Sequence, residues 1–263
     1  MRTEAGVSPV IIDKEYQVIF DRLDRILKTV ITAVWGQKPP PVEHRVLSKF
    51  VIYVAGNTRV IYRVLSNGES NEEVEAMGNA TCALLRCIWD AVIQAEYICH
   101  DPSMLESRAR QFEAFRIVEQ VSADEALQKH SNLFSQRLLS SQTRLTNKAA
   151  IDAEYLRVKS QYETQDGRMQ TKWYKGNLKI WATLVGAADE YLFFASISSS
   201  SVHAGPMALT TGPIFQGSAL FYFVLNLTAR CLKLLVKYGP ACLSNEDIKF
   251  INRLGKRFGD SPT

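Results

Sequence analysis

Hydrophobic residues recur every three to four positions through nearly every long segment of the chain. Between residues 13 and 35, the apolar positions that share this spacing are Tyr16, Ile19, Phe20, Leu23, Ile26, Leu27, Val30, Ile31 and Val34. They fall on one stripe of an α-helix, whereas a half-buried strand would alternate with a period of two. Gly36 and the prolines at 39–41 predict the end of this first helix.

The same periodicity predicts further helices over about 43–65, 70–99, 178–198 and 214–237, and a short basic helix after Ser244. The stretch 80–98 is apolar on most faces, which predicts that its helix lies at the centre. Residues 103–162 are also helical in pattern but more polar, with a break at 138–147. No segment predicts a strand. We therefore expect an all-α fold, a single bundle of long antiparallel helices over 1–263, with 102–165 as a candidate polar helical insert.

Composition narrows the class of protein. Of 263 residues, 46% are hydrophobic and 22% charged, which is typical of a soluble globular protein. The net charge of +4 is too small to indicate nucleic-acid binding by itself. Residues 1–6 lack the apolar stretch of a signal peptide, and polar residues interrupt the run 214–236, which favours a buried helix over a membrane span.

The cysteines point to a reducing compartment. There are five, an odd number, and none forms a Cys-x-x-Cys pair. This pattern favours reduced, buried thiols over a disulfide framework or a zinc knuckle. We expect a cytoplasmic protein without a bound metal or other cofactor.

Arg86 and Asp90 are candidate site residues in the apolar central helix. They are four residues apart, and Gln94 follows one turn later, so the three share a helix face. Charged groups in apolar surroundings need partners. One interpretation is an ion pair that serves only the structure, and the other is a pair placed at a cleft.

A serine-rich segment that ends in a histidine is the second candidate. Five of the six positions 196–201 are serine, including Ser199, and His203 follows before a Gly-Pro dipeptide. Tyr191 begins the apolar stretch that precedes them. An imidazole titrates near neutral pH, so His203 is a candidate general acid or base. The alternative is that His203 caps the carboxyl end of a helix.

The order of these motifs resembles a bacterial family of all-helical domains of unknown function. The resemblance covers about Ala80 to Pro206 and rests on Arg86 and Asp90, the run Trp173-Tyr174-Lys175-Gly176, Gly186, Tyr191, Ser199 and His203. That family usually has glutamate where this chain has Asp90.

A more distant resemblance is to the HEPN (higher eukaryotes and prokaryotes nucleotide-binding) nucleases, which cleave RNA without a metal by means of an arginine and a histidine. Here Ser198 stands at the arginine's spacing from His203, and Arg86 is a candidate replacement from a neighbouring helix. This resemblance implies a metal-independent ribonuclease of the prokaryotic toxin or phage-defence type.

In that hypothesis His203 is the general acid or base, Arg86 holds phosphate and Asp90 orients Arg86. Ser199, Tyr191 and Gln94 support them. The alternative is a non-enzymatic helical module that binds a partner protein or a small ligand. Whether the protein is an enzyme stays open on the sequence alone, and the expected partners are RNA, a partner protein or a second copy of the chain.

Overall fold

The computed structural model describes residues 14–66, 71–129, 148–173, 177–194 and 217–256. The elements that it places there are α1 (Lys14–Gly36), α2 (Val42–Ser66), α3 (Asn71–His100), the short 3-10 helix η1 (Pro102–Met104), α4 (Leu105–Lys129), α7 (Lys148–Tyr162), α8 (Leu178–Leu184), α11 (Gly217–Tyr238) and α12 (Asn245–Leu254). Apart from an isolated bridge between Glu163 and Met169, these ranges contain no β-structure. The all-α prediction is confirmed.

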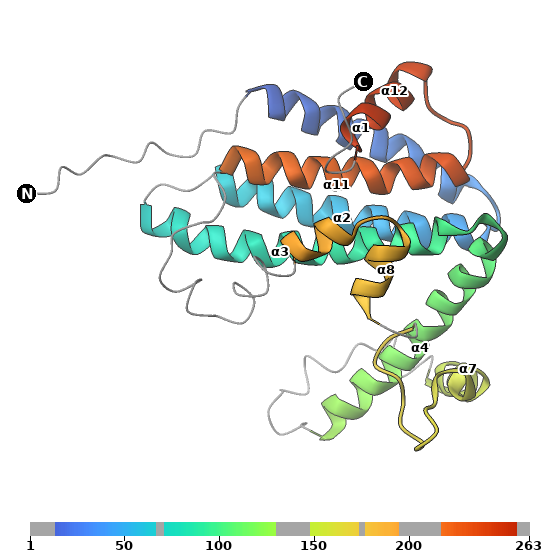
Figure 1. Cartoon of the computed structure of the whole chain (residues 1–263). Coiled ribbons are helices and arrows are strands. Elements are labelled where there is room, and N and C mark those ends of the chain that lie inside the picture. The colour runs from blue at the N-terminus through green and yellow to red at the C-terminus, as the bar shows by residue number, and fades with distance from the viewer. Residues whose placement is uncertain (1–13, 67–70, 130–147, 174–176, 195–216, 257–263) are drawn as a thin grey trace, which may run out of the picture. The chain divides into compact units, whose positions relative to one another are not determined.

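The contacts divide the chain into two compact units. The first comprises Met1–Leu105 and Asn177–Thr263, and the second comprises Glu106–Gly176. In the first unit α1, α2, α3 and α11 pack lengthwise as a bundle, and α11 contacts each of the other three (Figure 1). Long helices packing against one another agree with the predicted bundle. The single domain predicted over 1–263, with an insert at 102–165, stays a prediction.

Helix α3 lies at the centre of the first unit, as its apolar sequence predicts. Ile88, Trp89 and Val92 are fully buried. From the facing helix α11, Phe221, Val224 and Leu225 are equally buried. Burial of such large apolar side chains is the main force that drives a helical bundle together.

The predicted helix over 178–198 is wrong in its continuity. Helix α8 ends at Leu184, and a new helical segment covers 188–194. Gly186 has a φ of 73°, in the left-handed region that favours glycine. Its N–H donates to the carbonyl of Thr183, and the N–H of Ala187 donates to Ala182, which together form a Schellman-type end. The turn redirects the chain so that the 188–194 segment packs against α3.

Helix α12 is fastened to α1 and α11. Ser244 caps its start by accepting from the N–H of Asp247, as the sequence predicts. Hydrogen bonds from the Arg22 guanidinium of α1 lower the pKa of Asp247 below its usual value. At the other end, the amide of Asn226 donates to the carbonyls of Leu254 and Lys256. These contacts set Gly255 directly against the backbone of α11.

Replacing Gly255 with alanine should destabilise the protein by about 1–3 kcal/mol, because the new Cβ overpacks this contact. That Cβ would lie 3.0 Å from the backbone nitrogen of Arg230 and 3.1 Å from the carbonyl oxygen of Ile251. Urea unfolding measures the change. Gly56→Ala is the matched control: a Cβ there meets nothing within 4 Å, so this substitution inside α2 should stabilise by about 0.5–1 kcal/mol. Equal effects of the two substitutions would contradict the close approach of α12 to α11.

The second unit has its own small aromatic core. The Tyr162 hydroxyl of α7 donates to the carbonyl of Gln111 in α4, and its ring meets Phe115 edge-on. Trp173 is buried and meets Phe112 at an interplanar angle of 88°. Trp173 is therefore a packing anchor of the second unit.

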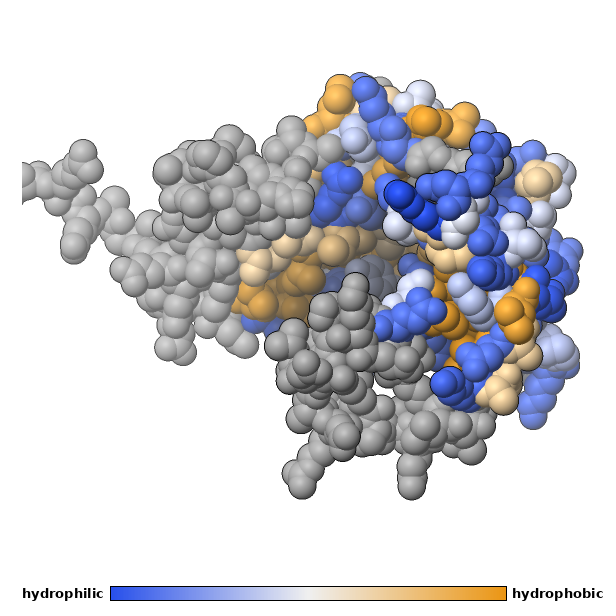
Figure 2. Space-filling model, turned by 90° about the horizontal axis from the view of Figure 1, so that it is seen from below, coloured by the Kyte–Doolittle hydropathy of each residue, from blue (hydrophilic) through white to orange (hydrophobic). Residues whose placement is uncertain are grey.

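None of the described helices combines the length and hydrophobicity needed to cross a bilayer. On the face drawn in Figure 2, hydrophobic and hydrophilic residues lie intermixed. All five cysteines are free thiols, and Cys82, Cys99 and Cys231 are buried as expected. Cys87 is exposed and Cys242 half-buried, so burial of every thiol is not borne out.

Candidate functional site

The Arg86–Asp90 pair predicted from the sequence is present on α3. Nε of Arg86 lies 2.7 Å from Oδ1 of Asp90, and the two side chains are 20% and 35% exposed. The pair is neither sealed in the core nor fully in solvent. Its charges are only partly screened by water, so each depends on the other more than in a typical surface ion pair.

Aromatic rings from two elements surround the guanidinium of Arg86. Its Cζ lies 5.1 Å from the ring centroid of Trp89 and 6.0 Å from that of Tyr191. Both distances are within the range of a cation–π contact. From α2, Tyr53 approaches the Cys87 thiol, and burial together with this thiol raises the pKa of Tyr53 above its usual value. We call Arg86, Asp90, Trp89 and Tyr191 the arginine cluster.

The structure thus brings together residues from two of the segments that the sequence singles out. Arg86 and Asp90 come from α3, and Tyr191 comes from the segment 188–194. Gln94 is half-buried, one helical turn beyond Asp90. Ser199 and His203 lie outside the described residues, so the predicted proximity of His203 to Arg86 stays a prediction.

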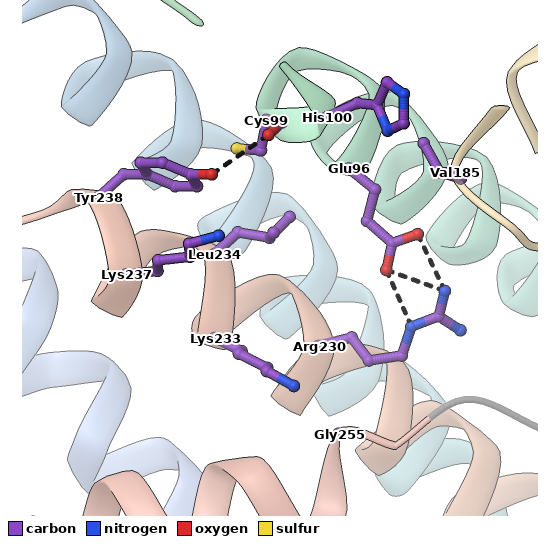
Figure 3. Close-up of a pocket in the computed structure, with 10 residues that line it drawn as sticks. All are labelled: Glu96, Cys99, His100, Val185, Arg230, Lys233, Leu234, Lys237, Tyr238 and Gly255. Atoms are coloured by element: carbon purple, nitrogen blue, oxygen red, sulfur yellow. Dashed lines mark hydrogen bonds and ion pairs between the residues drawn. The ribbon is translucent and has the colours of Figure 1, made fainter. Parts of the chain in front are cut away.

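A second polar cluster lies deeper in the bundle, and sequence reasoning missed it. Arg230 of α11 donates from Nη1 to Oε2 of Glu190 at 2.8 Å. Its Nε and Nη2 donate to Glu96 of α3, with Nη2 lying 2.9 and 3.0 Å from the two carboxylate oxygens. The indole N–H of Trp89 donates to Oε2 of Glu190 at 3.2 Å. Figure 3 shows the bidentate contact between Arg230 and Glu96.

This buried network holds more negative than positive charge. Glu190 and Arg230 are 4% and 3% exposed, and two carboxylates share one guanidinium. Burial disfavours the charged form of Arg230, yet the carboxylates of Glu96 and Glu190 raise its pKa above the usual value. Among the described residues, Oε1 of Glu190 is buried without a hydrogen-bond partner. Arg230 therefore offsets part of the carboxylate charge in this network and has a structural role.

One signal in the sequence marked Arg230. It interrupts the most apolar run of the chain, 214–236, and a buried charge needs a partner. The sequence does not say which acidic residue supplies the partner, since Glu96 lies 134 positions away and Glu190 lies 40 away.

The two clusters differ in what they can do chemically. In the buried network, all three guanidinium nitrogens of Arg230 donate to carboxylates. The arginine cluster is part-exposed, so its cation and the ring of Tyr191 can meet a ligand. Within the described residues, no group of three or more histidine, cysteine, aspartate or glutamate side chains is placed to hold a metal ion.

Comparison with known proteins gives one match. A model described as a family of unknown function, DUF5677, matches residues 60–212, which is more than half of the chain. The matched range includes Arg86, Asp90, Tyr191 and His203, and it ends before α11. Neither the curated proteins nor the solved structures include a match to the chain.

Proposed function

The chain belongs to the DUF5677 family of unknown function, and we propose from its side chains that it is a metal-independent ribonuclease. In this proposal the arginine cluster binds a phosphate and a neighbouring base of RNA, and His203 transfers a proton. The prokaryotic toxin or phage-defence role belongs to the same hypothesis.

One observation carries the proposal: the guanidinium of Arg86 lies beside the ring of Tyr191 on a part-exposed surface. A cation next to an aromatic ring suits RNA, because phosphate binds the cation and an unstacked base packs on the ring. Asp90 holds Arg86 in one orientation through its Nε. His203 follows Tyr191 by twelve residues along the chain, which is short enough to reach the same surface.

The chemistry needs two proton transfers and stabilisation of negative charge. The 2′-hydroxyl of RNA loses its proton to a base and attacks the adjacent phosphorus, and the 5′-oxygen leaves with a proton from an acid. The products are a 2′,3′-cyclic phosphate and a 5′-hydroxyl. Arg86 would stabilise the negative charge that develops on the phosphate oxygens in the transition state, and His203 would perform one of the two proton transfers.

Cleavage of a labelled RNA by the purified chain tests the proposal. His203→Ala should lower the cleavage rate about a hundredfold or more, since a proton-transfer group contributes this much. Its melting temperature should stay near that of the unsubstituted protein. His44→Ala is the control, because it removes a histidine outside the proposed site. His44 lies in the first turn of α2, where its Nδ1 contacts Gln37. No cleavage by the unsubstituted protein, or equal cleavage by His203→Ala, would refute the ribonuclease proposal.

The second candidate is a non-enzymatic helical module that binds a partner protein or a small ligand. The buried network of Arg230, Glu96 and Glu190 favours this candidate, because it shows that a polar cluster in this bundle can serve the structure alone. The behaviour of Asp90→Ala separates the candidates. If the protein is a ribonuclease, Asp90→Ala should lower the rate of RNA cleavage more than it lowers the free energy of unfolding. If the Arg86–Asp90 pair serves only the structure, Asp90→Ala should lower the free energy of unfolding, and the unsubstituted protein should cleave no RNA.

A further inference from the structure

A pocket lies between the carboxyl-terminal half of α3 and the last turns of α11. Its volume is about 290 Å³, and Val185 after α8 and Gly255 after α12 complete its wall (Figure 3). All of its lining residues belong to the first unit. Among the described residues, none of the arginine cluster lines the pocket, so it is distinct from that cluster.

Positive charge dominates the wall of this pocket. Lys233 and Lys237 of α11 line it, and the neighbouring lining residue His100 lies at the end of α3. Glu96 is the one carboxylate among the lining residues, and Arg230 already engages both of its oxygens. Within the described residues neither lysine forms an ion pair. Two like charges one helical turn apart repel each other, so an anion bound between them would relieve the repulsion.

The donors in this pocket suit a phosphate better than a carboxylate. An arginine guanidinium binds a carboxylate through two parallel hydrogen bonds, but the guanidinium of Arg230 already donates to Glu96. The remaining cations are lysine ammonium groups, which act as point charges and bind phosphate oxygens without a fixed plane. A phosphate also carries more negative charge than a carboxylate, which matches two lysines.

The volume and the apolar lining limit the size of the ligand. Ligand pockets typically span roughly 300–1,000 Å³, so this one is at the small end of the range. Leu234 and Val185 supply apolar surface beside the lysines. Tyr238 donates its hydroxyl to the carbonyl of Cys99 at 3.2 Å, which fixes its ring at the edge of the pocket.

We propose that this pocket binds a small phosphomonoester. Its phosphate would lie on Lys233 and Lys237, and its organic body would lie over Leu234 and Val185. This inference goes beyond the proposed ribonuclease and does not depend on it.

Calorimetric titration of the full chain with ribose 5-phosphate tests the pocket, with inorganic phosphate and ribose as the parts of that probe. Ribose 5-phosphate should bind more tightly than inorganic phosphate, and ribose should not bind. In the double variant Lys233→Gln/Lys237→Gln the affinity should fall about tenfold or more, because charge-assisted hydrogen bonds are lost. Its melting temperature without ligand should change little: both lysines are exposed and repel each other, which offsets the lost contact of Lys237 Nζ with the Tyr238 ring, 4.9 Å from the centroid.

Lys249→Gln is the matched control, because it removes an exposed lysine of α12 that does not line the pocket. It should bind the probe like the unsubstituted protein. Equal binding by the double variant, or the absence of saturable binding, would overturn the site. If ribose 5-phosphate binds no more tightly than inorganic phosphate, the proposal that the pocket also holds the organic part of the ligand is refuted. An RNA oligonucleotide that needs both lysines while ribose 5-phosphate does not bind would overturn the small-molecule assignment. The double variant should cleave RNA at the rate of the unsubstituted protein. This measurement therefore separates a failure of the pocket from a failure of the ribonuclease proposal.

Discussion

Arg230→Met is expected to destabilise the protein by about 3–5 kcal/mol, the usual cost of breaking a buried ion pair by removing one partner. The substitution keeps an unbranched chain of similar length but leaves Glu96 and Glu190 without their shared cation. The carboxylate of Glu96 on α3 and that of Glu190 in the 188–194 segment, both with little or no contact with water, would then lack a shared cation between them. Urea unfolding followed by circular dichroism measures the free energy of unfolding.

Two further variants make this result specific. Arg110→Met is the matched control: its ion pair with Glu106 is 68% and 62% exposed, so its loss should cost about 1 kcal/mol or less. The triple variant Arg230→Met/Glu96→Gln/Glu190→Gln removes all three charges and should recover much of the lost stability. A triple variant as unstable as Arg230→Met alone would show that unpaired charge is not the cause.

Trp89→Ala is expected to cost about 3–5 kcal/mol, as for other buried tryptophans truncated to alanine. The side chain is fully buried and its ring packs against Phe194 at a centroid distance of 5.5 Å. The substitution also removes the indole donor to Glu190. Because Trp89 carries one of the two rings beside Arg86, the arginine cluster should lose its shape as well.

Two controls separate packing from hydrogen bonding at this position. Trp89→Phe keeps an aromatic ring and loses the donor, so it should cost about 1–3 kcal/mol. Trp35→Ala removes a tryptophan of α1 that is 47% exposed, and its effect should be well below that of Trp89→Ala. If Trp35→Ala destabilised the protein as much as Trp89→Ala, burial would not explain the effect.

The arginine cluster shows how far a local pattern leads toward a site. Arg86 and Asp90 are four residues apart on one helix, so their pairing follows from helix geometry alone. Tyr191 was singled out with them from the order of the motifs, but its approach to Arg86 depends on how α3 meets the 188–194 segment. The chain reaches this contact because Gly186 ends α8 and turns the backbone. A single glycine in a helical pattern is compatible with a continuous helix, which is why the predicted helix over 178–198 was wrong in its continuity.

The sequence by itself determined most of the helices, the start of α12 after Ser244 and the central place of α3. These features depend on apolar stripes and on residues within a few positions of one another. The tertiary structure alone decided the partners of Arg230 and the pocket beside Lys233 and Lys237. Those contacts join α3, α11 and the segments after α8 and α12, which lie far apart along the chain. Helical periodicity states that a face is buried, but it does not state against which helix or in which register, because many pairings bury the same apolar area.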